Sequence, residues 1–155
     1  MISDLMILQK VPGRKPLAMF GRMFGRGVFL QLLAKLTGRS FHMLDIDELL
    51  KNYPLEASHT AGVKSVSIDR IRGTRGKAGE FDADFNPIQE RSRIRWMAVA
   101  REKLQGRELP PVELIQVGQI YYVCDGHHRI SVSRALGQAY IDAEVTIMRL
   151  RNLPR

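Results

Sequence analysis

The feature that most restricts the fold is the segment from Val112 to Gly137, which has the pattern of two strands, a tight turn and a helix. Both strand segments are rich in β-branched and aromatic residues. The Gly-Gln pair between them suits a type II′ hairpin, which takes glycine at its first turn position. Gly137 is a suitable end for the helix. Any fold of this chain must therefore contain a hairpin, Val112–Val117 with Ile120–Cys124, whose second strand leads directly into a helix.

Three more elements surround this segment. Val63–Ile71 has the composition of a strand. Asn86 and Pro87 resemble an N-cap followed by proline at the first helical position, which predicts a helix to about residue 105. Ile141–Ile147 alternates apolar and polar side chains, as a half-buried strand does. The order strand, helix, hairpin, helix, strand predicts an α/β (α+β) fold with a small mixed sheet.

The N-terminal part of the chain differs in composition. Leu17–Phe20, Val28–Leu36 and Ile46–Lys51 have helical patterns. Between Pro54 and Gly62, turn-forming and polar residues replace the periodic apolar ones. We therefore expect residues 1–58 to form a basic helical arm and residues 59–155 to form the main domain.

Charge and cysteine content narrow the class of protein. The net charge is +8, and residues 1–40 hold seven Lys or Arg residues and one acid. This excess favours an anionic partner, and nucleic acid, anionic lipid or nucleotide phosphate would each suit it. Cys124 is the sole cysteine, so no internal disulfide can form. The sequence contains no apolar run long enough to cross a bilayer and no secretory signal, which predicts a cytoplasmic protein without a transmembrane segment.

The loop Asp125-Gly126-His127-His128-Arg129 joins the second hairpin strand to the helix. A helix N-terminus carries unpaired amides and the positive end of the helix dipole. Glycine allows a ligand to approach the backbone, and the arginine and imidazoles can reach an anion from the first turn. The loop is therefore predicted to bind an anion, and a phosphate group is the leading candidate.

This loop resembles that of the ParB N-terminal/sulfiredoxin superfamily. Sulfiredoxins carry Gly-Gly-Cys-His-Arg here, ParB proteins a Gly-Glu-Arg-Arg type motif, and related free-serine kinases an Asp-Gly-His-x-Arg form, which is the closest of the three. Ala135-Leu136-Gly137 also matches the end of the ParB helix. The resemblance covers Val63 to Met148. It implies a sulfiredoxin-like fold and a nucleotide ligand, although the superfamily includes CTP-binding clamps, ATP-dependent sulfinic acid reductases, kinases and proteins labelled nucleases.

The chain departs from the sulfiredoxin pattern in its cysteine, and the resemblance implies one further site residue. His127 stands where sulfiredoxins have their catalytic cysteine, so that reaction is not expected. Cys124 lies three residues earlier and is expected to be a buried core thiol. Arg75 belongs to the turn after the first strand, a region that faces the nucleotide in this superfamily.

Several residues have alternative interpretations. Asp125 could cap the helix, or it could orient a ribose, a metal-bound water or an imidazole. His127 and His128 could hold phosphate, act as an acid–base pair or bind a metal. No set of Cys and His residues with metal-ligand spacing accompanies them, so no metal site is predicted and phosphate binding is favoured. Asp82 and Asp84 could hold Mg²⁺ or act as a base, or they could lie in an acidic loop that its phenylalanines anchor.

Three functions are compatible with this pattern. The first is binding of a nucleoside triphosphate or diphosphate, with or without Mg²⁺, in a phosphotransferase or nucleotide hydrolase whose catalytic groups are Asp82, Asp84 and His127. The second is a DNA-binding, ParB-like regulatory module that uses the basic arm. The third is a nuclease. The arm could also lie on a membrane surface, pack on the core or contact a second subunit in a homodimer.

Overall fold

A computed structural model describes residues 14–76 and 79–154. Within them, six strands form a single sheet: β1 (Leu44–Asp45), β2 (Leu55–Ser67), β3 (Ile71–Thr74), β4 (Val112–Val117), β5 (Ile120–Asp125) and β6 (Tyr140–Leu150). The helices are α2 (Arg14–Thr37), α3 (Ile46–Asn52), α4 (Arg93–Leu104) and α5 (His127–Ala135). Short 3₁₀ turns span Ile68–Arg70 and Glu90–Ser92. No helix in the described ranges is both long and apolar enough to cross a bilayer.

The strands lie in the order β1-β3-β5-β4-β6-β2. Neighbours pair in parallel for β1 with β3, β3 with β5 and β4 with β6, and antiparallel for β4 with β5 and β2 with β6. The sheet is therefore mixed, which confirms the predicted fold class. The hairpin is also confirmed, because β4 and β5 have almost the expected bounds.

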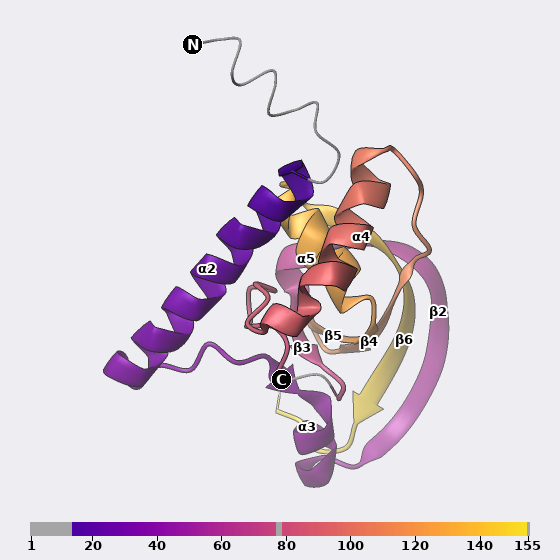
Figure 1. The fold of residues 1–155 in the computed structure, drawn as a ribbon. Coiled ribbons are helices and arrows are strands. Elements are labelled where there is room, and N and C mark those ends of the chain that lie inside the picture. The colour runs from indigo at the N-terminus through magenta and orange to yellow at the C-terminus, as the bar shows by residue number, and fades with distance from the viewer. Residues whose placement is uncertain (1–13, 77–78, 155) are drawn as a thin grey trace.

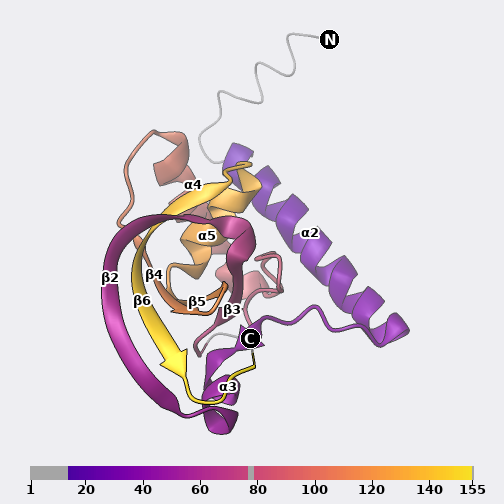
Figure 2. The same ribbon diagram turned by 180° about the vertical axis from the view of Figure 1, so that it is seen from behind.

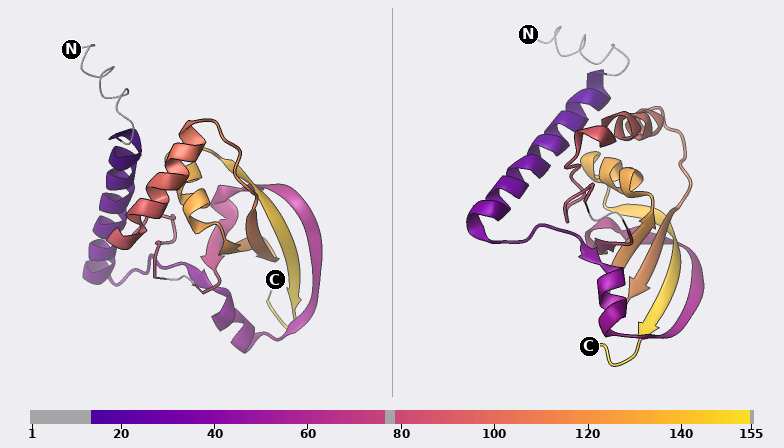
Figure 3. Two further views of the ribbon diagram at one scale, coloured as in Figure 1. Left: turned by 45° about the vertical axis from the view of Figure 1, so that its right-hand side comes forward. Right: turned by 60° about the horizontal axis from the view of Figure 1, so that its bottom comes forward.

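The helices cover the sheet unequally. The sheet curls around α5, α4 lies over α5, and α2 lies outside α4, whereas α3 lies near the other end of the sheet (Figures 1 and 3). Alternation along β4 supplies both faces: Val112 and Leu114 belong to the main core under α4 and α5, and Ile115 and Val117 belong to a smaller core. α3 contributes Ile46 to that smaller core.

Residues 55–62, in the polar stretch where the sequence predicted the limit between arm and main domain, belong to a strand. β2 runs from Leu55 to Ser67 at the edge of the sheet and pairs with β6 along its length. The expected limit between residues 58 and 59 therefore falls inside this strand, and β1 and α3 before it also belong to the sheet assembly. Figure 2 shows β2 curving along the outer margin beside β6. Val66 is the single buried residue of β2, so the first part of this edge strand carries none of the apolar alternation that marks a half-buried strand.

Two helices differ from their predicted bounds. α2 is continuous through Gly21 and Gly25, because its packing on α4, where Phe20 meets Trp96 edge-on at 5.7 Å between ring centroids, outweighs the low helix propensity of glycine. α4 begins at Arg93 and not at residue 87. The chain before it instead forms an isolated bridge from Pro87 to the 81–85 loop.

Candidate anion site at the first turn of α5

A glycine in the left-handed region connects β5 to α5. Gly126 has φ 105°, and a Cβ atom there would collide with the side chain of Val112 in the neighbouring strand β4. Any other residue would be strained and would also push β4 away. The close packing of the two strands is thus sufficient to explain the glycine, without the ligand approach that the sequence suggested.

No side chain caps the N-terminus of α5. Gly126 is the N-cap residue, and the first intrahelical hydrogen bond runs from the Ile130 N–H to the Gly126 carbonyl at 3.0 Å. Asp125, which was a candidate cap, accepts a 2.6 Å hydrogen bond from Arg129 instead. The positive end of the α5 dipole is therefore not neutralised by its own cap residue.

The guanidinium of Arg129 is already used within the protein. Its Nη1 donates to the carbonyls of Pro110 and Pro111 at 2.6 and 2.9 Å, and its Nη2 donates to Asp125. These bonds tie the start of β4 to the first turn of α5. Arg129 therefore has a structural role that the sequence prediction, which assigned it to phosphate, did not include.

The two histidines are buried against the loop at residues 81–85. Nε2 of His127 lies 2.7 Å from the hydroxyl of Thr74 at the end of β3. The ring of His127 stacks on Phe81 at 6.1 Å, and the ring of His128 meets Phe81 edge-on at 5.1 Å. Both imidazoles thus take part in core packing, whereas their backbone belongs to the first turn of α5.

A pocket of about 320 Å³ lies beside this turn. The predicted residues Asp125 to Arg129 form one side, and α4 and Leu109 supply the rest: Arg95, Ala98, Val99, Arg101, Glu102 and Leu109. Arg95 and Arg101 are exposed, and neither forms an ion pair with another described residue. The pocket therefore combines a helix N-terminus with two available guanidinium groups. Nothing in the sequence pairs α4 with α5, so the position of Arg101 beside the loop was not predictable.

Arg75 does not line this pocket. It lies 3.7 Å from Asp47 and borders a separate hollow of about 490 Å³, which Glu113 and Glu144 also line. Cys124 lines the same hollow. Its thiol is therefore half-buried, whereas the sequence suggested a fully buried core thiol. Burial raises the pKa of the Cys124 thiol, which disfavours the nucleophilic thiolate.

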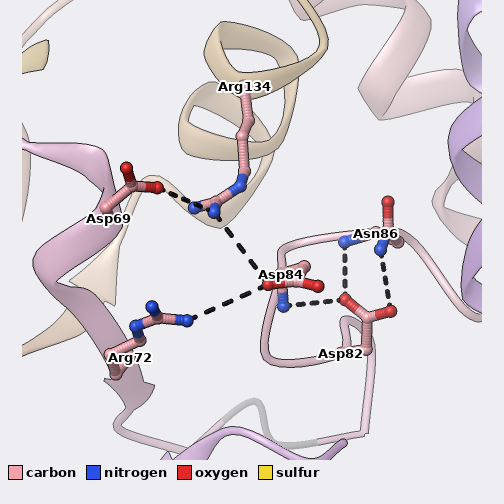
Figure 4. Close-up of polar contacts among 6 residues, drawn as sticks. All are labelled: Asp69, Arg72, Asp82, Asp84, Asn86 and Arg134. Carbon is pink, nitrogen blue, oxygen red and sulfur yellow. Dashed lines mark hydrogen bonds and ion pairs between the residues drawn. The ribbon is translucent and has the colours of Figure 1, made fainter. Parts of the chain in front are cut away.

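Asp82 organises its own loop. Its buried carboxylate accepts hydrogen bonds from the N–H groups of Asp84 and Asn86, at 3.0 and 2.9 Å, and from the Asn86 side-chain amide at 2.9 Å (Figure 4). Burial raises the pKa of Asp82, and the hydrogen bonds from Asn86 oppose that shift. This network holds the turn in which Phe85 takes φ 60°, a conformation uncommon for a non-glycine residue.

Asp84 lies between two arginines. Its Oδ1 is 3.9 Å from both Arg72 and Arg134, and Arg134 also donates a 2.9 Å hydrogen bond to Asp69 (Figure 4). Neither Asp82 nor Asp84 lines the α5 pocket. The phenylalanines of this loop, Phe81 and Phe85, are fully buried, as expected for an anchored loop. In the ranges 14–76 and 79–154, no group of three or more His, Cys, Asp or Glu side chains is placed to hold a metal ion.

The chain was compared with protein families, curated proteins and solved structures. No protein-family model matches the chain, and no curated protein matches it. The crystal structure of sulfiredoxin from Arabidopsis thaliana is similar with a TM-score of 0.40 and 17% sequence identity, over 54% of this chain and 82% of that chain.

Proposed function

We propose that the protein binds the phosphate groups of a nucleotide in the pocket between α4 and the first turn of α5. The observation that carries this proposal is the convergence of the uncapped α5 N-terminus with the side chains of Arg95 and Arg101 on one pocket. A helix N-terminus attracts anions through its amides and its dipole, and guanidinium groups bind phosphate oxygens in bidentate fashion.

The size of the pocket is suited to this ligand. Its volume of about 320 Å³ lies within the range of small-molecule sites. A second pocket of about 440 Å³ shares Leu109 and Arg129 with it and is lined by polar groups that include Ser65, Gln138 and Asp142. A nucleotide could occupy both pockets, with its phosphates in the first and its nucleoside in the second. Arg129 then supports the boundary between them.

Phosphotransfer or nucleotide hydrolysis is the activity that such a site would serve. The carboxylates in the pocket are those of Asp125 and Glu102, so Asp125 replaces Asp82 and Asp84 as the acid for Mg²⁺ or for a substrate hydroxyl. Asp125 is about half exposed, which leaves it accessible beside its ion pair with Arg129. Mg²⁺ bound to nucleotides commonly keeps several waters and takes only one or two protein carboxylates.

The test is calorimetric titration of the full chain with ATP, ADP, CTP and GTP, with and without Mg²⁺. We expect one nucleotide to bind and Arg95→Gln or Arg101→Gln to weaken its affinity by about tenfold or more, the effect of losing a charged hydrogen bond. Arg91→Gln is the matched control, because Arg91 is exposed, precedes α4 and does not line the pocket. Equal affinity of all three variants and the unmodified protein would refute the assignment.

The same titration addresses the nucleic-acid alternative. If no nucleotide binds, the α5 turn is a structural junction only, and the basic N-terminal part becomes the leading candidate for an anionic partner. DNA binding with a steep salt dependence, lost when the exposed basic residues of α2 are neutralised, would then support the DNA-binding alternative.

A further inference from the structure

The outer face of α2 is apolar and exposed in the part of the chain that the structure describes. Among the described residues, α2 buries only Pro16, Met19, Phe20 and Gly27. Phe29, Leu32 and Leu36 are 62%, 56% and 76% exposed, and Leu17 and Val28 are exposed as well. Large apolar side chains that are exposed together, and not singly, mark an interaction surface.

These side chains form one row. At about 100° per residue, Val28, Phe29, Leu32 and Leu36 lie on successive turns of one side of the helix, opposite the side that packs on the core. The C-terminal half of α2 also projects away from the sheet in Figures 1 and 3. The row is therefore accessible to a large, flat surface.

The charge of α2 has a single sign. The helix contains five basic residues and no acidic one: Arg14, Lys15, Arg22, Arg26 and Lys35. By the same helical spacing, Arg22 and Arg26 lie along one margin of the apolar row and Lys35 along the other. A helix with an exposed apolar row bordered by basic side chains has the pattern of an interfacial membrane helix.

We propose that α2 binds the surface of a bilayer that contains anionic lipids. Phe29, Leu32 and Leu36 enter the boundary between headgroups and acyl chains, and Arg22 and Arg26 contact the lipid phosphates. Charge complementarity selects this partner: an anionic surface attracts the helix, whereas a second α2 would bring like charges together. Nucleic acid would satisfy the arginines but would leave the apolar row in water.

The experiment is cosedimentation of the full chain with vesicles of phosphatidylcholine alone or mixed with phosphatidylglycerol. We expect binding to the mixed vesicles, little binding to phosphatidylcholine alone, and a decrease in binding as salt is raised. Arg22→Gln and Arg26→Gln should each weaken binding about fivefold, the contribution of one basic residue near an anionic surface. Arg149→Gln, a charge change on β6, should leave binding unchanged.

The apolar contribution has its own matched pair of variants. The triple variant Phe29→Ser, Leu32→Ser, Leu36→Ser should lose at least about tenfold in vesicle affinity, because three side chains no longer enter the bilayer. The control triple variant Leu55→Ser, Val63→Ser, Ile94→Ser removes exposed apolar groups elsewhere and should bind as the unmodified protein does. All six side chains are exposed, so both variants should fold, which circular dichroism checks.

Three results would overturn the proposal. The first is absence of binding to the mixed vesicles, and the second is equal binding by the two triple variants. The third is that the unmodified protein self-associates or binds DNA but does not bind vesicles, and that the α2 triple variant loses this interaction. That result would assign the apolar row to a second copy of the chain or to nucleic acid. Nucleotide titration of the α2 variant separates this outcome from failure of the α5 site, because α2 contributes no residue to that pocket.

Discussion

The indole Nε1 of Trp96 in α4 donates a 2.8 Å hydrogen bond to the hydroxyl oxygen of Ser131 in α5. The same hydroxyl donates a 2.6 Å hydrogen bond to the carbonyl of Phe85. All three residues are buried. One serine therefore links the two core helices and also holds the unusual backbone of the 81–85 loop that packs on His127 and His128.

Removal of this hydroxyl should destabilise the fold. Ser131→Ala leaves a buried N–H and a buried carbonyl without their partner, which should lower the free energy of unfolding by about 2 kcal/mol. Ser133→Ala on the same helix is the control, because the buried Ser133 hydroxyl has no hydrogen-bond partner among the described residues and its loss should change stability by less than about 1 kcal/mol. Urea denaturation of both variants measures the difference, and equal effects would contradict the assigned role.

The junction between β5 and α5 should tolerate no side chain. Gly126→Ala should cost about 3 kcal/mol, since it adds backbone strain at φ 105° and a collision with Val112. Gly118→Ala in the hairpin turn has a left-handed backbone at φ 58° but open space around it, and should cost about 1 kcal/mol. Thermal unfolding would show the ranking, and a smaller shift for Gly126→Ala than for Gly118→Ala would disprove the packing argument.

Asp82 should be replaceable by asparagine but not by alanine. Asp82→Ala leaves the Asp84 and Asn86 donors without an acceptor and should cost about 3 kcal/mol. Asp82→Asn keeps a carbonyl oxygen for the two backbone N–H groups, and a flipped Asn86 amide can accept from the new one, so the cost should stay within about 1 kcal/mol. Chemical denaturation at neutral pH distinguishes the two variants.

The raised pKa of Asp82 also predicts a pH dependence with a definite sign. Because the pKa is higher in the folded than in the unfolded chain, the folded state holds this proton more tightly. The stability of the unmodified protein relative to Asp82→Asn should therefore fall as pH rises from the unfolded pKa, 3.8, through the folded value, and then stay constant. A relative stability that rises over this window would show that the hydrogen bonds outweigh burial.

Arg129 should matter for stability independently of any ligand. Arg129→Ala removes the hydrogen bonds to Pro110, Pro111 and Asp125 and should cost about 2 kcal/mol, and Arg129→Lys should recover part of that through the ion pair. Arg149→Ala breaks an exposed pair with Glu56 and should cost less than about 0.5 kcal/mol. If Arg129→Ala is as stable as Arg149→Ala, the three hydrogen bonds contribute nothing.

The elements with a strong local pattern were predictable from the sequence. The Gly-Gln turn defined the β4–β5 hairpin, and Gly137 marked the end of the α5 segment. Phe81 and Phe85 are in the core, as expected for phenylalanines that anchor the acidic loop. In each of these cases the signal is a turn residue or a large apolar side chain, and its effect does not depend on a distant partner.

The parts that depend on distant partners were not predictable. Asn86 looks like a helix cap but binds Asp82, because that bond satisfies a buried carboxylate. Arg101 lines the α5 pocket only because α4 lies over α5. Arg75 borders another hollow, although Thr74 next to it in the chain contacts His127 of the loop. Composition and spacing do not show which polar side chains of one helix or strand will face another element that is distant in the sequence.

The pairing of β2 with β6 has a consequence for how the chain reaches its native state. β2 ends at Ser67, yet its partner strand begins at Tyr140, and β2 has no other neighbour in the sheet. Contacts between residues so far apart in sequence raise the contact order, and the entropy of closing a long loop must be overcome before they form. During synthesis, the backbone N–H and C=O groups of β2 therefore stay without their strand partner until β6 has left the ribosome. Closure of this outer pair is expected to be the slow step of folding and the stage most exposed to aggregation.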